Sequence, residues 1–312
     1  MKKNAEGVLD DNKLRRNVLL KKKFRNLDLI VFMGPYLVTF AVFTVLPVII
    51  SFIFGFTNFN MMEWPEWVGL ENYSRLLLND EIFSKAFQNT LVLSFVTGPL
   101  GYIICFAFSW LINEVPPKPR AFLTLLFYAP SLSGGFAFVW QLLFSGDSNG
   151  YINAWLQQWG MISEPIQFLS DADYMWPVCI VIILWGSLGT SFLTFIAGLQ
   201  TVDKSLYEAG AVDGIKNRWQ ELYFITLPSM RGQLMFGAIM SITGAFGIGG
   251  TITAVFGFPT QDYTLHTIMH HLDDYGGTRF EIGYASAIAT ILFVLSFVAN
   301  QIVQFLIKKI GK

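Results

Sequence analysis

The sequence predicts an all-α integral membrane protein with six transmembrane helices and both termini in the cytoplasm. Three observations support this prediction: the apolar composition, six long segments without charged residues, and the uneven distribution of Lys and Arg. Of the 312 residues, 53% are hydrophobic and 14% are charged, whereas soluble domains carry about 25% charged residues. One soluble core of this size cannot bury so much apolar surface, so lipid is the natural environment for the excess.

Six windows free of Asp, Glu, Lys and Arg are long enough to cross a bilayer. A helix needs about 20 apolar residues to span about 30 Å of hydrocarbon. The windows are 29–62, 86–113, 121–146, 174–202, 232–261 and 282–307. The expected helices lie within them, near 29–56, 88–111, 122–144, 176–199, 233–256 and 283–307. A shorter stretch rich in Asn and Gln, 148–163, predicts an amphipathic helix at the surface.

The basic residues predict the orientation, because cytoplasmic segments of membrane proteins carry an excess of Lys and Arg. With the N-terminus inside, 18 of the 21 Lys and Arg residues lie in cytoplasmic segments, and the outer segments hold Arg75, Lys85 and Arg279. We interpret the basic residues 1–27 as a cytoplasmic tail that anchors the first helix. A cleavable signal peptide or a nucleic-acid-binding arm is not expected there. Residues 28–310 form the expected membrane domain.

The longest cytoplasmic loop after the tail, residues 203–228, predicts two short helices around a turn. Asp203 is a suitable N-cap for the first helix, and Gly214 suits the left-handed conformation that ends a helix. Pro228 is expected to end the second helix before the membrane begins again. Small residues at 209–211 keep the first helix thin, so that another protein can approach its backbone closely.

This loop resembles the EAA loop in permease subunits of ABC importers, in the branch that includes the maltose permeases. The residues that fit the family pattern are Glu208, Ala209, Gly214, Ile225, Leu227 and Pro228, and Asp213 and Thr226 are typical of the sugar branch. There are two departures. Gly210 stands where the family has Ala, and ten residues separate Gly214 from Ile225, one more than in the family pattern. Segments 67–73, 89–90 and 282–287 are also similar to the family.

The resemblance implies a type I, MetI-like importer permease with several partners. A second permease subunit would complete the pathway, two cytoplasmic ATP-binding subunits would supply the energy, and an extracytoplasmic solute-binding protein would deliver the solute. Segment 208–214, which includes Gly210 and Asp213, would dock on an ATP-binding subunit. The expected location is the bacterial cell membrane.

Several motifs are missing from the sequence. There is no Gly-x-x-x-x-Gly-Lys-Ser/Thr loop, so we expect neither an enzyme nor a bound cofactor here, and ATP would bind to the partner subunit. No charged residue lies at the centre of an expected membrane helix, which argues against ion coupling and favours a neutral solute. Cys105 and Cys179 lie in apolar windows and are interpreted as buried thiols without a disulfide.

A pathway for sugars needs hydroxyl or amide groups and flat aromatic faces. The candidates are Trp140, Gln141, Trp185, Ser187, Ser191, Thr243 and Phe246. Ser187, Thr190, Ser191 and Thr194 share one face of an expected helix. Small residues four apart, from Gly186 to Gly198, are equally typical of helix packing, so both interpretations stay open. Two interpretations also remain for the glycine-rich segment 244–250. It can pack against another helix, or it can break its own helix where a solute binds, as in many transporters.

Three histidines, His266, His270 and His271, fall in the outer segment between the fifth and sixth expected helices. His266 and His270 are four residues apart, but apart from Asp273 or Asp274 no acidic or Cys side chain is available to complete a ligand set at helical spacing. We therefore predict no metal site. We interpret these residues as part of a surface helix that contacts the solute-binding protein.

The predicted function is the membrane-spanning permease subunit of an ATP-driven, binding-protein-dependent importer for a sugar or oligosaccharide. An alternative keeps this architecture and changes the cargo to a peptide, a lipid-derived compound or glycerol phosphate. A secondary carrier is a further alternative, and it would transport without an ATPase.

Overall fold

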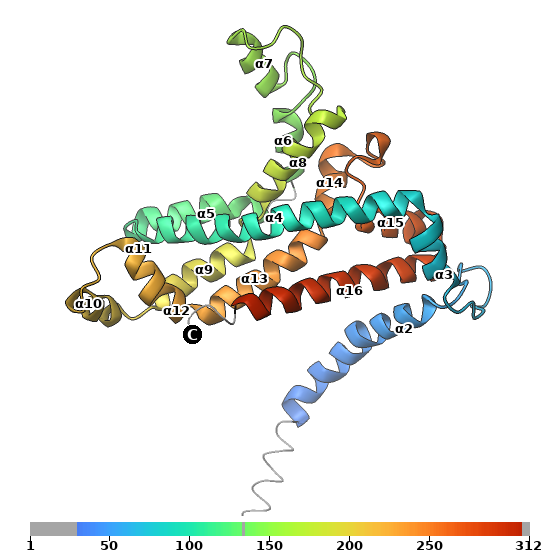
Figure 1. The fold of residues 1–312 in the computed structure, drawn as a ribbon, viewed down its shortest axis with the longest axis horizontal. Helices are drawn as coiled ribbons and strands as arrows, with labels where there is room; N and C mark the ends of the chain where they lie inside the picture. The colour runs from blue at the N-terminus through green and yellow to red at the C-terminus, as the bar shows by residue number, and fades with distance from the viewer. Residues whose placement is uncertain (1–29, 133–134, 308–312) are drawn as a thin grey trace, which may run out of the picture. The chain divides into compact units, whose positions relative to one another are not determined.

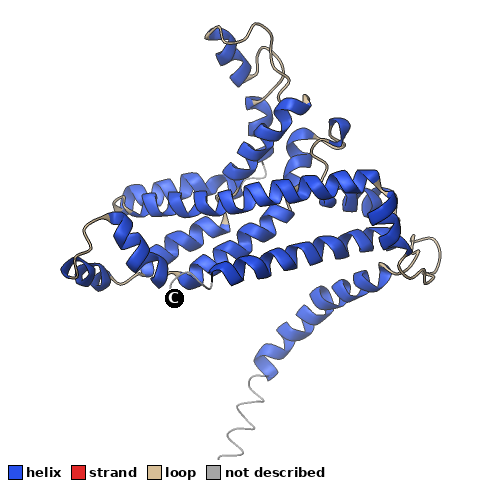
Figure 2. Ribbon diagram, in the orientation of Figure 1, coloured by secondary structure: helices blue, strands red, loops and turns tan. Residues whose placement is uncertain are grey.

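The computed structural model describes residues 30–132 and 135–307. The expected basic tail 1–27 and the C-terminal lysines lie outside this part of the chain. Within it, every regular element is a helix (Figure 2), and an isolated bridge joins Thr57 and Trp67. The chain divides into two units, one ending at Phe54 and one beginning at Gly55, and each is described by itself.

The first unit contains one helical span, Ile30–Phe54. It includes the π-helical turn η1 (Ala41–Val45) and the helix α2 (Leu46–Phe54). Its 25 residues give a length of more than about 35 Å at about 1.5 Å per residue, enough to cross a bilayer. This helix confirms the first expected one.

The second unit contains the other helices (Figure 1). They are α3 (Glu71–Ser74), η2 (Arg75–Asn79), α4 (Glu81–Asn113), α5 (Pro117–Leu132), α6 (Phe136–Leu143), α7 (Tyr151–Gln158), α8 (Ala172–Gly186), α9 (Thr190–Thr201), α10 (Lys204–Val212), α11 (Arg218–Glu221), η3 (Leu222–Thr226), α12 (Leu227–Ser229), α13 (Arg231–Phe246), α14 (Gly249–Phe256), η4 (Gln261–Tyr263), α15 (Ile268–Asp273), η5 (Asp274–Thr278) and α16 (Ile282–Ile307). The helix α7 lies within the expected amphipathic segment 148–163.

Two helices of this unit, α4 and α16, are long and apolar enough to cross a membrane alone. The other three windows each hold a pair of shorter helices: α5 with α6, α8 with α9, and α13 with α14. The helix axes bend by 42° between α8 and α9 and by 49° between α13 and α14. Helices therefore lie in all six windows, as expected. The expectation of one uninterrupted helix in each of these three windows is wrong.

The long helix α4 packs against α8, α9 and α13 and supports both bends. The Cys105 thiol donates a hydrogen bond to the carbonyl oxygen of Ser187 at 3.0 Å. The Ser94 hydroxyl donates to the carbonyl oxygen of Ala245, also at 3.0 Å. Backbone groups released by a break at membrane depth need such partners, because lipid offers none. Both of these breaks therefore lie where side chains of α4 donate hydrogen bonds to the backbone carbonyl oxygens.

Close contact between α9 and α13 depends on Gly237. A Cβ atom added at Gly237 would lie 2.3 Å from Cζ of the buried Phe195 ring. Gly232 lies on the same helix, and a Cβ added there would meet no atom within 4 Å. The two glycines therefore form a matched pair for a packing test.

Replacing Gly237 by alanine is expected to destabilise the protein by about 1–3 kcal/mol, because an overpacked interior forces rings and backbone apart. The measurement is the thermal unfolding midpoint of the purified protein in detergent. Gly232→Ala is the control and should leave the midpoint unchanged or raise it slightly. Equal midpoints for the two variants would contradict the packing described here.

Candidate functional site

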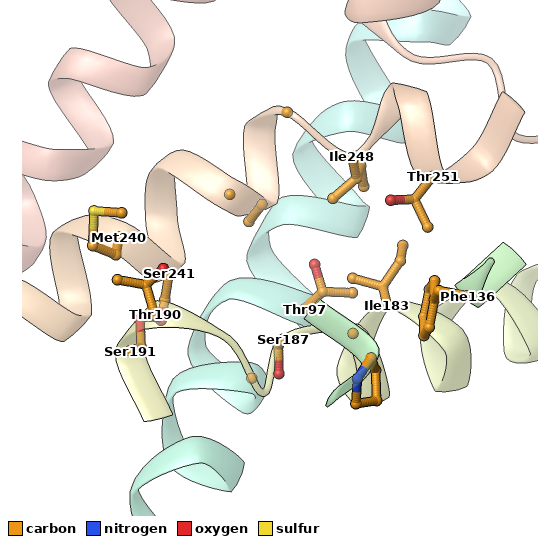
Figure 3. Close-up of a pocket in the computed structure, with 16 residues that line it drawn as sticks. Thr97, Phe136, Ile183, Ser187, Thr190, Ser191, Met240, Ser241, Ile248 and Thr251 are labelled. Atoms are coloured by element: carbon orange, nitrogen blue, oxygen red, sulfur yellow. Dashed lines mark hydrogen bonds between the residues drawn. The ribbon is translucent and has the colours of Figure 1, made fainter. Parts of the chain in front are cut away.

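A cavity of about 320 Å³ lies beside the α8–α9 break and the α13–α14 break (Figure 3). Hydroxyl groups from four helices and the α8–α9 break line it, and none of the described lining residues carries a charge. The hydroxyl residues are Thr97, Ser187, Thr190, Ser191, Ser241 and Thr251. Phe136, Ile183, Met240 and Ile248 supply apolar surface.

Three of these six hydroxyl groups, those of Thr97, Ser187 and Ser191, donate to backbone carbonyl oxygens. The Thr97 hydroxyl donates to the carbonyl oxygen of Leu93 at 2.7 Å, and the Ser191 hydroxyl donates to that of Gly237 at 3.2 Å. Each oxygen keeps lone pairs that can accept a hydrogen bond from a ligand. The cavity therefore suits a small, neutral molecule that carries donors and has an apolar face to lay against the Phe136 ring.

Two of the predicted pathway residues, Ser187 and Ser191, line this cavity. Thr97 on α4 and Phe136 on α6 also line the cavity and are not among the residues predicted from the sequence. Neither residue stands out in its own window, because a single Thr or Phe in an apolar helix is unremarkable. Only the packing of α4 and α6 around the breaks brings them to the cavity.

The other candidates lie elsewhere. Trp140 and Trp185 contact each other, with ring centroids 6.4 Å apart, and line an adjacent apolar depression that shares Phe136 with the cavity. The Gln141 amide donates to the carbonyl oxygen of Ala254 at 2.9 Å and so joins α6 to α14. Thr243 is exposed and Phe246 is buried, and neither lines the cavity. A pathway role for these residues stays a prediction.

The stripe of small residues from Gly186 to Gly198 serves two purposes, because the break at residues 187–189 divides it. Thr190 lines the cavity. Gly198, farther along α9, lies against α13: a Cβ added there would be 2.8 Å from side-chain atoms of Gln233 and Met230. One part of the stripe therefore lines the cavity and another part packs against α13, and a pathway role for the cavity-lining part stays a prediction.

The loop 203–228 begins and turns as the sequence predicts. The Asp203 carboxylate accepts a hydrogen bond from the Ser205 amide at 2.9 Å, which caps α10 and lowers the pKa of Asp203. Gly214 has a φ of 93°, in the region that side chains disfavour. At this turn the Ile215 amide donates to the carbonyl oxygen of Gly210 at 2.9 Å, a bond typical of helix C-termini.

One face of α10 is exposed and the other is packed. Glu208, Ala209, Asp213 and Gly214 are exposed, and between them Val212 is 88% exposed. We name residues 208–214 the docking turn. A single exposed apolar side chain is common on protein surfaces, so contact of this turn with a partner stays a prediction.

The packed face of α10 lies on η3. Gly210 is buried there, and a Cβ added to it would be 2.7 Å from Cδ1 of Ile225. The Tyr207 and Thr226 hydroxyl oxygens are 2.9 Å apart. The docking turn is therefore held against the second helical stretch of the loop.

That second stretch is continuous through α11, η3 and α12. Pro228 lies in α12, and the stretch ends one residue later, at Ser229, before α13 begins at Arg231. The expectation that the second helix ends at Pro228, before the next membrane helix, is therefore confirmed to within one residue. Ile225 is buried, Leu227 is half-buried and Pro228 is exposed.

The π-helical turn η3 accounts for the extra residue between Gly214 and Ile225. A π turn holds one residue more than an α turn, so Ile225 still reaches Gly210. Deletion of the exposed Tyr223 is expected to convert η3 into an α turn and to keep the docking turn in place. The free energy of unfolding of the purified protein should fall by less than about 1 kcal/mol, since the α turn keeps Ile225 beneath Gly210. Deletion of Ser205 from α10, where no π turn can absorb the loss, is the control and should lower it further; equal losses of stability in both deletions would contradict this account.

The three histidines are buried, each with only 2% of its surface exposed, so the expectation of a surface helix is wrong for them. Several of their ring nitrogens have partners inside the protein, whereas His266 Nδ1 and His270 Nε2 are buried without one among the described residues. His271 Nε2 lies 3.0 Å from Oδ2 of Asp80, and His266 Nε2 lies 3.3 Å from His271 Nδ1. The Tyr284 hydroxyl donates to the same Asp80 oxygen at 2.7 Å. Across 30–132 and 135–307, no group of three or more His, Cys, Asp or Glu side chains is placed to hold a metal ion.

Side chains of α4 hold this histidine segment in place. The Asn89 amide donates to the carbonyl oxygens of Thr264 at 3.0 Å and His266 at 2.9 Å. The Thr90 hydroxyl oxygen accepts a hydrogen bond from the Ile268 amide at 2.9 Å. The Asn-Thr pair at 89–90 thus anchors the segment that joins α14 to α16.

Acid is expected to destabilise this region, because burial lowers the pKa of His266 to about 3 and that of His270 to about 4. Both rings stay neutral in the folded protein, whereas the unfolded chain takes up protons below the ordinary value of 6.5. Their contribution is therefore complete above pH 6.5 and is lost as the pH falls toward 4. Each histidine costs about 1.4 kcal/mol per pH unit in that interval.

The measurement is the thermal unfolding midpoint between pH 7.5 and 5.0. A double variant, His266→Gln with His270→Gln, is the control and should show a much flatter profile. Burial raises the pKa of Asp80, but hydrogen bonds from the Phe83 amide and Tyr284, and the charge of His271, lower it overall. Asp80 therefore stays ionised between pH 7.5 and 5.0 and does not change the stability of the protein in that range. Equal pH profiles for the native and double-variant proteins would contradict the histidine assignment.

The chain matches known proteins over most of its length. The family model described as "Binding-protein-dependent transport system inner membrane component" matches residues 120–312. The probable ABC transporter permease protein YesP of Bacillus subtilis is 31% identical over 85% of each chain. The lactose transport system permease protein LacF of Rhizobium radiobacter is 27% identical over 72% of this chain and 74% of its own.

A solved structure has the same fold. It is the crystal structure of a bacterial ABC transporter involved in the import of the acidic polysaccharide alginate. The matching chain is 24% identical, with a TM-score of 0.77 over 94% of this chain and 99% of that one.

Proposed function

Because this chain belongs to the family of binding-protein-dependent transport system inner membrane components, we propose that it is the permease subunit of an ATP-driven importer for a sugar or oligosaccharide. The observation that carries the choice of solute is the uncharged, hydroxyl-lined cavity at the helix breaks. Sugar hydroxyls can pair with its Ser and Thr oxygens, and a sugar C–H face can stack on Phe136. The lactose permease LacF and the alginate importer, both similar to this chain, transport saccharides according to their names.

We further propose that each bent pair of helices is one membrane span, so that the chain crosses the bilayer six times. Both termini then face the cytoplasm, in keeping with the distribution of Lys and Arg. This topology puts the loop 203–228 inside and the histidine segment outside.

The proposed assembly contains a second permease subunit, two cytoplasmic ATP-binding subunits and an extracytoplasmic solute-binding protein. The exposed docking turn, with Val212 at its tip, is the proposed contact with one ATP-binding subunit. ATP-dependent closure of those subunits would favour one of two arrangements of the helices, through a difference in binding free energy between the two. ATP hydrolysis belongs to the partner subunits, and this chain has no enzymatic step of its own.

The test is reconstitution of the complex in liposomes with its solute-binding protein. We expect ATP-dependent uptake of a labelled sugar such as lactose or a short oligosaccharide, and faster ATP hydrolysis when the binding protein is loaded. Uptake of glycerol phosphate or a peptide in place of every sugar tested would refute the sugar assignment. Uptake that continues without ATP and stops with an ionophore would refute the importer assignment altogether.

A further inference from the structure

An ion pair joins the loop 203–228 to the end of α4. Arg218, the first residue of α11, lies with Nη2 2.9 Å from Oε2 of Glu114, and its Nη1 is 2.7 Å from Oε2 of Glu221. Beside this pair, the Trp219 and Trp110 rings pack with centroids 5.2 Å apart. Glu114 and Trp110 belong to the C-terminal end of α4, more than 100 positions earlier in the sequence.

The α4 side of this contact is fixed. Glu114 directly follows the last residue of α4. The Arg120 guanidinium donates to the carbonyl oxygen of Asn113 at 2.7 Å and to that of Val115 at 3.1 Å. These bonds satisfy carbonyls at the helix end and hold the turn between α4 and α5. The Glu114 carboxylate therefore projects from a rigid corner.

The α11 side is tied to the docking turn. Residues 218–229 form one helical stretch, and η3 in that stretch contacts α10 through Ile225 beneath Gly210 and through Thr226 beside Tyr207. A force on the docking turn therefore reaches Arg218 and Trp219 through packed helical segments.

The helices around the cavity differ in how they are connected to this loop. The chain runs from α9 directly into α10 and from α12 directly into α13, so both helices must follow the loop when it moves. No such covalent link joins the loop to α4. Yet α4 carries Thr97 and Gly101 of the cavity wall and donates hydrogen bonds to both helix breaks.

We propose that the Glu114–Arg218 ion pair, with the Trp110–Trp219 contact beside it, transmits movement of the docking turn to α4 and thereby to the solute cavity. Trp110 and Thr97 are 13 residues apart on one uninterrupted helix, a distance of about 20 Å at about 1.5 Å per residue. The proposal rests on the proposed function, in which an ATP-binding subunit moves the docking turn. Glu114 and Arg218 act as positioning residues, since neither lines the solute cavity.

The pair contributes to coupling rather than to folding. The Arg218 side chain is 63% exposed and that of Glu114 is 41% exposed, and ion pairs this accessible to solvent add little to stability. Both residues can therefore be exchanged without unfolding the protein, so a transport defect can be assigned to lost transmission.

The experiment measures solute transported per ATP hydrolysed in the reconstituted complex. Glu221→Gln removes the other partner of Arg218, which lies on α11 itself, and is the matched control: its ratio should equal that of the native complex. Two variants break the ion pair. One is Glu114→Arg alone, and the other is Arg218→Glu in the Glu221→Gln background. Each should lower the ratio about tenfold, within the range of coupling energies measured along such networks. The combined exchange Glu114→Arg with Arg218→Glu, in the same background, restores opposite charges and should return the ratio to within about twofold of the control.

Co-purification of the ATP-binding subunits and the unfolding midpoint are measured for every variant, and neither should change. The proposal is overturned if the single exchanges keep the native ratio, or if the combined exchange fails to restore it. Loss of the ATP-binding subunits from the single variants would also overturn it, because these residues would then belong to the docking surface. Failure of the proposed function is a different result, in which the native complex itself shows no ATP-dependent uptake.

Discussion

Replacing Gly214 by valine is expected to abolish ATP-driven uptake and to release the ATP-binding subunits from the purified complex. Gly214 has a φ of 93°, and a β-branched side chain is strongly disfavoured in that region. The strain of about 1–3 kcal/mol corresponds to a loss of docking-competent protein of about fivefold to more than a hundredfold. Co-purification through a tagged ATP-binding subunit and uptake into liposomes measure the effect.

The matched control is Gly160→Val. Gly160 has a φ of 70°, follows α7, and has no atom within 4 Å of an added Cβ. The substitution therefore introduces similar backbone strain far along the sequence from the docking turn, and the subunits should stay bound. A Gly214→Val complex that kept its ATP-binding subunits and its uptake would show that the docking turn has another role.

Replacing Gly244 by phenylalanine is expected to block transport while the complex stays assembled. Gly244 lines the cavity, and a Cβ added there meets no atom within 4 Å, so the new ring has room to occupy the space that the solute needs. Uptake should fall by at least about tenfold, equivalent to the loss of about 1.4 kcal/mol of solute binding. Uptake of labelled sugar and co-purification of the ATP-binding subunits are measured together.

Gly232→Phe is the control for this experiment. Gly232 lies on the same helix, α13, and also has open space around an added Cβ, but it does not line the cavity. Uptake should stay near the native level. If the Gly232 variant lost as much uptake as the Gly244 variant, or if the Gly244 variant transported normally, the solute pathway would have to lie outside this cavity.

Local signals in the sequence predict local structure well. Asp203 caps α10 through an amide two residues away, and Gly214 turns the chain by its own backbone freedom. Both predictions depend on neighbours within a few residues, so the sequence contains all that is needed.

The boundaries of α4 illustrate a limit of prediction from the sequence. The charge-free window predicts a helix near 88–111, and the helix runs from Glu81 to Asn113. Its first turn contains the charged Glu81 and is stabilised by the Asp80 side chain, which accepts a hydrogen bond from the Phe83 amide at 2.8 Å. A search for apolar windows does not detect a helix start made by a polar cap.

By itself, the sequence determined the class of this protein, the positions of its apolar windows and the caps of its docking loop, because composition and short-range hydrogen bonds decide these features. The tertiary structure alone decided where the helices break, which hydroxyls meet in the cavity and whether the histidines face solvent. The donors to the broken backbone come from α4, and the partner of His271 is Asp80, 191 positions away. Burial of a polar group depends on such distant partners, and only folding brings them together.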